Sequence, residues 1–232
     1  LEASLQEDRP LGLLEFPGEG ATLYERLAGT PALEALFHRA MAEYSLRAPK
    51  VTTYASFDGM KSLLDVGGAN GAIAQTICER HPELTVTILD RASVCEIGER
   101  DNQGRSVRER IRFVAGDFLS DPWPGPFDGV LFSHVVEIFG EPEIRSLYRQ
   151  AHASLAPGGK TFIWTLTTDD EEKGGLQAAK SSLYFVAVAS GRGMAYPASD
   201  HVRWLKEAGF VSTERINFPE MDHSLVIASK GS

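Results

Sequence analysis

The sequence is poor in cysteine and in positive charge, and it contains no long apolar run. Its two cysteines, Cys78 and Cys95, are too few for a disulfide framework and lack metal-site spacing. Lys and Arg number 23 against 32 Asp and Glu, and the resulting formal charge of −9 disfavours a nucleic-acid partner. No apolar stretch approaches the roughly 20 residues that span a bilayer, and no signal segment opens the chain. We expect a cytoplasmic protein that binds a small molecule, with no metal, nucleic-acid or membrane partner.

The 232 residues are 43% hydrophobic, which is enough for one sizeable core. Prolines and glycines break residues 1–20 into short pieces, which is typical of a linker. Residues 32–45 carry apolar side chains at i, i+3 and i+4 spacing, which predicts an amphipathic helix. We therefore predict an N-terminal linker and helical segment at 1–58 and a main domain at 59–232. Because the first residue is Leu1, we also expect further chain upstream.

Short apolar runs alternate with helical patterns after residue 59, which is typical of βαβ units. The runs are 62–66, 85–89, 111–115, 129–132 and 161–166, and the helical patterns between them are 72–80, 92–102 and 143–155. Two last runs, 211–217 and 224–228, are too close for a crossover helix and should pair antiparallel at an edge. The prediction is a doubly wound, mostly parallel seven-stranded α/β sheet. A helical insert at 176–189 interrupts the alternation.

A glycine-rich turn, Asp-Val-Gly-Gly-Ala-Asn-Gly at 65–71, follows the first predicted strand and opens a helix. Glycine permits positive φ and close approach of a ligand, and ligands bind at the carboxyl ends of the strands in open α/β sheets. Asp65 can accept hydrogen bonds from a ligand ammonium or from the N–H groups of the turn itself. The turn lacks the G-x-G-x-x-G spacing of dinucleotide dehydrogenases, and an acidic turn suits a pyrophosphate poorly.

Two further carboxylates end the next two predicted strands. Asp90 stands where nucleotide-binding α/β folds bind ribose, and Asp117 precedes Phe118, whose ring can pack on a purine. Each alone is also typical of a turn or a helix cap. The order of the three acidic strand ends favours an adenosyl ligand that carries a sulfonium and an ammonium. S-adenosylmethionine (SAM) therefore fits better than NAD.

Segments 37–45, 64–71, 116–118, 155–159 and 205–210, together with Asp90, resemble the class I, Rossmann-like O-methyltransferases that act on plant phenolics and bacterial natural products. The resemblance runs from Tyr24 to Ser229. It implies a SAM-dependent methyltransferase of secondary metabolism, such as antibiotic biosynthesis, with a small aromatic acceptor. It also implies that the cofactor is bound by Asp65, Gly67, Gly68, Gly71, Asp90, Arg91, Asp117, Phe118 and Ser133.

The sequence departs from this family at two places. Family members usually begin with a winged-helix dimerisation domain of about a hundred residues, a common domain size, and this chain starts just after its place. The sequence leaves two possible partners open: a second copy of the chain in a homodimer, and a companion N-terminal domain. The family's general base is a histidine in a pattern like V-L-H-D-W, whereas residues 135–139 read Val-Val-Glu-Ile-Phe. The base position is thus Glu137.

Two catalytic candidates follow from this departure. Glu137 would act as a base if burial raised its pKa, and otherwise it is a solvated or capping glutamate. His134 suits proton transfer near neutral pH, although the resemblance places it and Ser133 beside the cofactor. Methylation at oxygen is favoured, methylation at carbon or nitrogen stays open, and a SAM-binding protein that does not methylate is the alternative.

Aromatic and methionine side chains on the early helix and on the insert are candidates for the acceptor pocket. Each is equally typical of a core position, but as a set they suit a flat aromatic acceptor. The set is Phe37, Met41, Tyr44, Tyr184, Phe185 and Met194.

Overall fold

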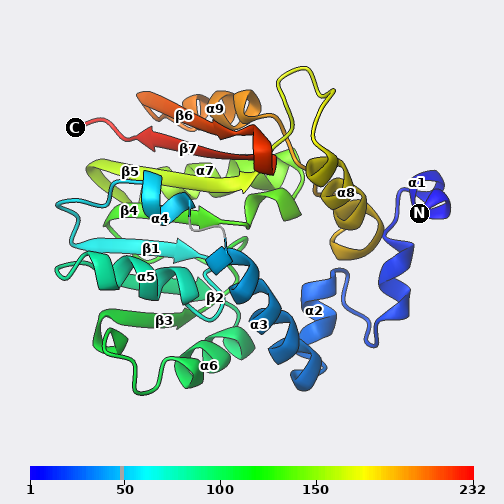
Figure 1. Cartoon of the computed structure of the whole chain (residues 1–232), viewed down its shortest axis with the longest axis horizontal. Helices are drawn as coiled ribbons and strands as arrows, with labels where there is room; N and C mark the ends of the chain where they lie inside the picture. The colour runs from blue at the N-terminus through cyan, green and yellow to red at the C-terminus, as the bar shows by residue number, and fades with distance from the viewer. Residues whose placement is uncertain (48–49) are drawn as a thin grey trace.

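A computed structural model describes residues 1–47 and 50–232 of the chain, and its strands form one sheet in the order β3-β2-β1-β4-β5-β7-β6 (Figure 1). The strands are β1 (Ser62–Val66), β2 (Thr85–Asp90), β3 (Ile111–Ala115), β4 (Phe127–Ser133), β5 (Leu155–Leu166), β6 (Ser212–Phe218) and β7 (His223–Ser229). Strands β1 to β5 pair in parallel, and β7 is antiparallel to both β5 and β6. The predicted seven-stranded, mostly parallel sheet with an antiparallel edge is confirmed.

Helices pack on both faces of the sheet. The helices of the chain are α1 (Glu2–Glu7), α2 (Leu23–Ala28), α3 (Pro31–Arg47), α4 (Lys50–Tyr54), α5 (Ala72–Arg80), α6 (Ala92–Asp101), α7 (Glu141–Ser154), α8 (Leu176–Tyr184) and α9 (Ala198–Glu207), of which α1, α2 and α8 lie beside the sheet rather than on it (Figure 1). Successive strand residues point to opposite faces, so Leu63 packs with Ile77 of α5 while Leu64 belongs to the cluster of Leu147 and Trp204 from α7 and α9. The sheet is therefore doubly wound, with a core on each face.

The junction between α7 and β5 differs from the prediction. We expected a helix through residue 155 and a strand from 161, but α7 ends at Ser154 and β5 begins at Leu155. Phe127 pairs with Leu155 and Gly129 with Lys160, so the glycine-containing segment between them bulges out of the ladder. A Pro-Gly-Gly sequence that reads as a turn is thus an irregularity inside one long strand.

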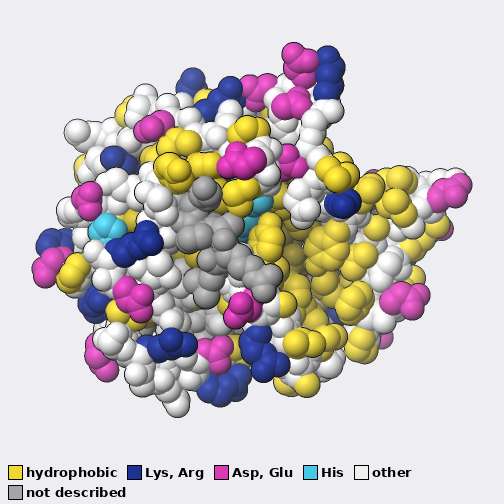
Figure 2. Space-filling model, viewed as in Figure 1, with side chains coloured by type: hydrophobic (Ala, Val, Ile, Leu, Met, Phe, Trp, Pro, Cys, Tyr) yellow, Lys and Arg dark blue, Asp and Glu magenta, His cyan; other side chains and the backbone are white. Residues whose placement is uncertain are grey.

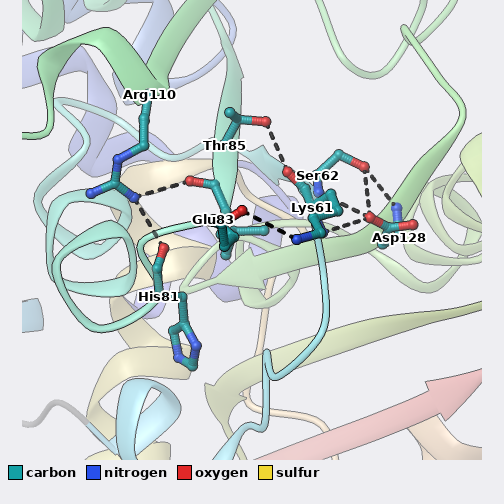
Figure 3. A network of polar contacts seen from close by, with 8 residues as sticks. Lys61, Ser62, His81, Glu83, Thr85, Arg110 and Asp128 are labelled. Atoms are coloured by element: carbon teal, nitrogen blue, oxygen red, sulfur yellow. Dashed lines mark hydrogen bonds and ion pairs between the residues drawn. The ribbon is translucent and has the colours of Figure 1, made fainter.

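A polar network fixes the amino ends of β1 and β4 against the start of β2 (Figure 3). One carboxylate oxygen of Asp128 accepts hydrogen bonds from the backbone N–H groups of Lys61 and Ser62, at 2.8 and 3.0 Å. The hydroxyl of Thr85 donates to the carbonyl of Lys61 at 3.0 Å, and Arg110 donates to two carbonyls of the loop before β2. These contacts set the strand register at the edge of the sheet opposite the glycine-rich turn.

The N-terminal segment packs on the insert that contains α8. Leu13, Leu23 and Leu27 are buried in a cluster that also includes Tyr184 and Val188. Figure 2 shows hydrophobic side chains gathered on the side of the molecule where α1 to α3 and α8 lie. Within residues 1–47 and 50–232, no helix is both long and apolar enough to cross a membrane.

Candidate functional site

The turn between β1 and α5 is built on backbone that only glycine suits. Gly67 has a φ of 68°, and a Cβ atom there would lie 2.8 Å from a methyl group of Val135. A Cβ atom on Gly68 would lie 2.5 Å from a carboxylate oxygen of Asp65. Gly71, with a φ of 82°, immediately precedes α5. The predicted turn is therefore tight enough to bring its backbone close to a ligand.

Asp65 is buried directly beneath this turn. The side chain is 1% exposed, and neither carboxylate oxygen has a hydrogen-bond partner in the part of the chain that the structure describes. Burial, together with the nearby charge of Asp90, raises the pKa of Asp65 to about 8. A buried carboxylate without a partner is costly, and a ligand ammonium would satisfy it. This orphaned group fits the amino-acid ammonium of SAM.

Asp90 links the turn to the end of β2. Its two oxygens accept hydrogen bonds from the backbone N–H groups of Ala69, at 3.0 Å, and Arg91, at 2.8 Å. Burial raises the pKa of Asp90, and these two N–H groups and the Arg91 charge offset part of that rise. Each carboxylate oxygen has a second lone pair, so both can still accept a ribose hydroxyl.

Arg91 joins the N-terminal helices to this edge of the sheet. Its guanidinium donates to the backbone carbonyl of Tyr24 and pairs with Glu34 Oε1 at 3.3 Å. Tyr24 lies in α2 and Glu34 in α3, so both helices are held against the carboxyl end of β2.

Asp117 and Phe118 lie beyond β3. Asp117 is exposed and accepts hydrogen bonds from Leu119 N–H and the Ser120 hydroxyl, which makes it a cap of its own turn. The ring of Phe118 reaches to 3.7 Å from the Cβ position of Gly67 and packs edge-on against Phe139. Phe118 is therefore beside the glycine-rich turn.

His134 and Glu137 form a hydrogen-bonded pair just after β4, which ends at Ser133. His134 Nδ1 lies 3.0 Å from Glu137 Oε1, and the Thr165 hydroxyl donates to Glu137 Oε2 at 2.8 Å. Burial raises the pKa of Glu137, but the hydrogen bonds from His134 and Thr165 and the charge of His134 outweigh it, and the pKa is lowered overall. The raised pKa that Glu137 would need to act as a base is therefore absent, because His134 and Thr165 hydrogen-bond the buried carboxylate.

This pairing determines which atom of His134 is basic. An ionised carboxylate only accepts hydrogen bonds, so His134 Nδ1 carries the proton that Glu137 binds. Nε2 of the neutral ring is then left with its lone pair. Glu137 is 2% exposed and both its oxygens are engaged, so Nε2 of His134 is the proton acceptor that the pair offers.

Aromatic rings surround His134. Tyr44, Trp164 and His223 pack edge-on against it, with ring centroids 5.4, 6.2 and 5.1 Å away. His223 Nδ1 donates to the backbone carbonyl of Met221, which leaves its Nε2 as an acceptor as well. A cavity of about 670 Å³ opens beside these rings, lined by Tyr44, Leu176, Gln177, Glu220, Met221, Asp222 and His223.

Of the residues predicted to line an acceptor pocket, Tyr44 lines this cavity and the others lie elsewhere. Phe37 packs edge-on against Tyr24 in the N-terminal cluster, and Phe185 is buried among apolar side chains of the insert. Tyr184 packs against both clusters, Met194 is half-buried, and Met41 is exposed on α3.

Sequence reasoning missed three residues at this site: Tyr24, His38 and His223. Tyr24 holds Arg91 through its backbone and hydrogen-bonds the Tyr184 hydroxyl, while His223 stacks on Trp164 at 5.0 Å. His38 is buried on α3. Tyr24 and His223 act through contacts distant in sequence, and no local spacing marks any of the three residues. Among residues 1–47 and 50–232, no group of three or more His, Cys, Asp or Glu side chains is arranged to hold a metal ion.

Comparisons with known proteins show the family to which the chain belongs. A family model described as an O-methyltransferase domain matches residues 4–211. The L-tyrosine C(3)-methyltransferase of Streptomyces lavendulae is 30% identical over 231 residues, which cover 98% of this chain and 63% of that protein. The 3-hydroxy-5-methyl-1-naphthoate 3-O-methyltransferase of Streptomyces sahachiroi is 28% identical over 184 residues, covering 79% of this chain and 53% of that protein. The chain thus spans less than two thirds of either relative.

Solved structures share the fold. The S-adenosylmethionine-dependent methyltransferase SibL, in its apo form, matches with a TM-score of 0.84 and 33% identity, covering 100% of this chain and 68% of that one. Human N-acetylserotonin methyltransferase in complex with SAM matches with a TM-score of 0.87 at 22% identity, covering 100% of this chain and 65% of that one, and at this identity shows the fold alone. The class I methyltransferase fold and the predicted cofactor, SAM, are confirmed.

Proposed function

Because the chain belongs to the SAM-dependent O-methyltransferase family, we propose that it transfers the SAM methyl group to a hydroxyl of a small aromatic natural-product intermediate. The observation that carries this proposal is the His134–Glu137 pair, whose imidazole packs against Tyr44 and His223 in the lining of the cavity of about 670 Å³. A general base next to a pocket of drug-like size is what methylation of a phenol requires.

The cofactor-binding residues set the position of the reaction. Asp65 binds the ammonium of SAM, and Asp90 accepts hydrogen bonds from its ribose hydroxyls. The backbone at Gly67 and Gly68 allows the cofactor to approach the turn closely. SAM supplies an electrophilic methyl group on a sulfonium. Because the displacement is in line, the protein accelerates it by holding the acceptor oxygen in the attack direction.

His134 supplies the proton acceptor. Its Nε2 takes the proton of the acceptor hydroxyl, and the resulting imidazolium is stabilised by Glu137, whose negative charge is maintained by the low pKa described above. The hydroxyl oxygen forms the bond to the methyl group as the carbon–sulfur bond breaks. Glu137 is thus a positioning residue in this mechanism, and His134 is the base.

Methylation at carbon is a second candidate. The L-tyrosine C(3)-methyltransferase matches 98% of this chain, and it is named for methylation of a ring carbon next to a phenol oxygen. Deprotonation of a phenol by His134 would increase the electron density on that carbon as well as on the oxygen. The same base would therefore serve both outcomes, and the orientation of the acceptor would decide between them.

Incubation with methyl-labelled SAM and a panel of hydroxylated aromatics tests this proposal. We expect labelled product and S-adenosylhomocysteine from the wild-type chain, with the position of the label distinguishing oxygen from carbon. His134→Ala should lower the rate by about 10²- to 10⁴-fold, the usual contribution of a general base. Its affinity for S-adenosylhomocysteine should stay unchanged. Cofactor binding without turnover on the whole panel would instead support a SAM-binding protein that does not methylate.

A further inference from the structure

Helix α3 covers the carboxyl end of β2. Glu34, in its first turn, accepts a hydrogen bond from the hydroxyl of Ser93 at 3.0 Å and pairs with Arg91 at 3.3 Å. His38 follows Glu34 by four residues and so lies on the same face of the helix. This face of α3 therefore points toward the region that immediately follows Asp90.

The imidazole of His38 is buried without a hydrogen bond. It is 7% exposed, and within the described residues neither ring nitrogen has a partner. Burial and the charge of Arg91 lower the pKa of His38 to about 4, so the ring is neutral and presents one donor and one acceptor. Buried polar groups in native proteins are nearly always paired, so these nitrogens call for a partner.

The two charged groups that shift the pKa of His38, Arg91 and Asp101, both lie next to residues of the candidate cofactor site. Arg91 follows Asp90, and Asp101 at the end of α6 accepts a hydrogen bond at 3.2 Å from the side chain of Asn70 in the glycine-rich turn. His38 thus lies near residues that support the cofactor turn from both sides. Its neutral ring suits an uncharged hydroxyl or a carboxylate, and SAM offers both.

We propose that His38 is a cofactor-binding residue whose ring nitrogen hydrogen-bonds an oxygen of SAM, either a ribose hydroxyl or the amino-acid carboxylate. The orphaned nitrogens of His38 and the orphaned carboxylate of Asp65 then have one explanation, since the same ligand satisfies both. Helix α3 becomes a wall of the cofactor site.

Calorimetric titration of the whole chain with S-adenosylhomocysteine and with 5′-methylthioadenosine, which lacks the amino-acid portion, tests the proposal. His38→Phe should weaken S-adenosylhomocysteine binding by about three- to tenfold, the effect of one hydrogen bond. Equal weakening for both ligands identifies the ribose as the partner, and weakening for S-adenosylhomocysteine alone identifies the carboxylate. Unchanged affinity for both ligands would overturn the proposal.

Two further variants separate binding from stability. His38→Asn keeps a donor and an acceptor and should recover part of the affinity lost in His38→Phe; equal losses in the two variants would contradict a hydrogen bond. His201 is a second buried histidine with a pKa lowered to about 4, and it bonds the Tyr148 hydroxyl at 2.7 Å. His201→Phe should lower the thermal midpoint and leave ligand affinity unchanged. In His38→Phe without ligand, the midpoint should not fall, because two unpaired nitrogens have been removed.

Discussion

Glu137 Oε1 lies 3.0 Å from His134 Nδ1, and this contact makes a buried glutamate and a neighbouring histidine into one functional unit. The hydroxyl of Thr165 holds the other oxygen of Glu137, so the carboxylate cannot turn away from the ring.

Replacing Glu137 by Gln should lower kcat by about 10²-fold, because the imidazolium formed at His134 loses its negative partner. The amide keeps the shape of the side chain and the contact with Thr165, so the KM for SAM should change little. Steady-state kinetics with labelled SAM measures both constants. Thr165→Val is the matched control and should cost far less, since it leaves the charge in place. A Glu137→Gln protein with the full rate would remove this pair from the mechanism.

Glu137 should also stabilise the fold in a pH-dependent way. Its pKa in the folded protein lies below the ordinary 4.5, so its contribution is present above pH 4.5 and is lost as the pH falls through the folded value. The free energy of unfolding of Glu137→Gln, measured in urea, should therefore fall less steeply with acid than that of the wild type. Glu214→Gln, at an exposed position of β6, should follow the wild-type curve. Parallel curves for all three proteins would contradict the low pKa.

Asp65 should make cofactor binding depend on pH, with an affinity that increases as the pH rises. Its folded pKa of about 8 lies above 3.8, so the ligand-free fold keeps the proton and loses stability as the pH rises from 3.8 through 8. A ligand ammonium favours the ionised carboxylate. Affinity for S-adenosylhomocysteine should therefore increase toward pH 8, by up to about tenfold per unit. Calorimetry across this pH range should show that the affinity for S-adenosylhomocysteine rises with pH in the wild type and in the control variant Asp117→Asn, but not in Asp65→Asn. A wild-type affinity that does not change with pH would contradict the ammonium contact.

A methyl group on Gly68 should disable the turn through a specific clash. The Cβ atom would lie 2.5 Å from a carboxylate oxygen of Asp65, so Gly68→Ala should lower both stability and S-adenosylhomocysteine affinity, the latter by at least about tenfold. In an Asp65→Ala background the same change should cost much less. A double-mutant cycle measures this coupling, and simple additivity of the two effects would show that the clash is relieved in another way.

The sequence predicted the framework of the site better than its chemistry. The ends of β1 and β3 and of α5 match the predicted 62–66, 111–115 and 72–80, because each is a short apolar pattern bounded by local turn signals. The start of β5 was missed because a Pro-Gly-Gly bulge and a turn look alike in sequence. The cofactor-binding roles proposed for Asp65 and Asp90 rest on their positions at strand ends.

The protonation chemistry depends on contacts that no local pattern encodes. The low pKa of Glu137 comes first from His134, three residues before it, and is assisted by Thr165, which is 28 residues away. His223 approaches His134 only because β7 inserts between β5 and β6. These pairings are products of the sheet order, and a single sequence read along its length does not contain them.

Helix α3 has a thermodynamic consequence beyond the contacts of its individual side chains. Near its start, Glu34 is tied to the end of β2, and further along the same helix Tyr44 lines the cavity proposed to bind the acceptor. A ligand that fixes the position of the first part of α3 also fixes the position of its second part, because the helix is continuous. Cofactor and acceptor should therefore favour one another's binding, and the coupling is reciprocal, typically about 1–3 kcal/mol.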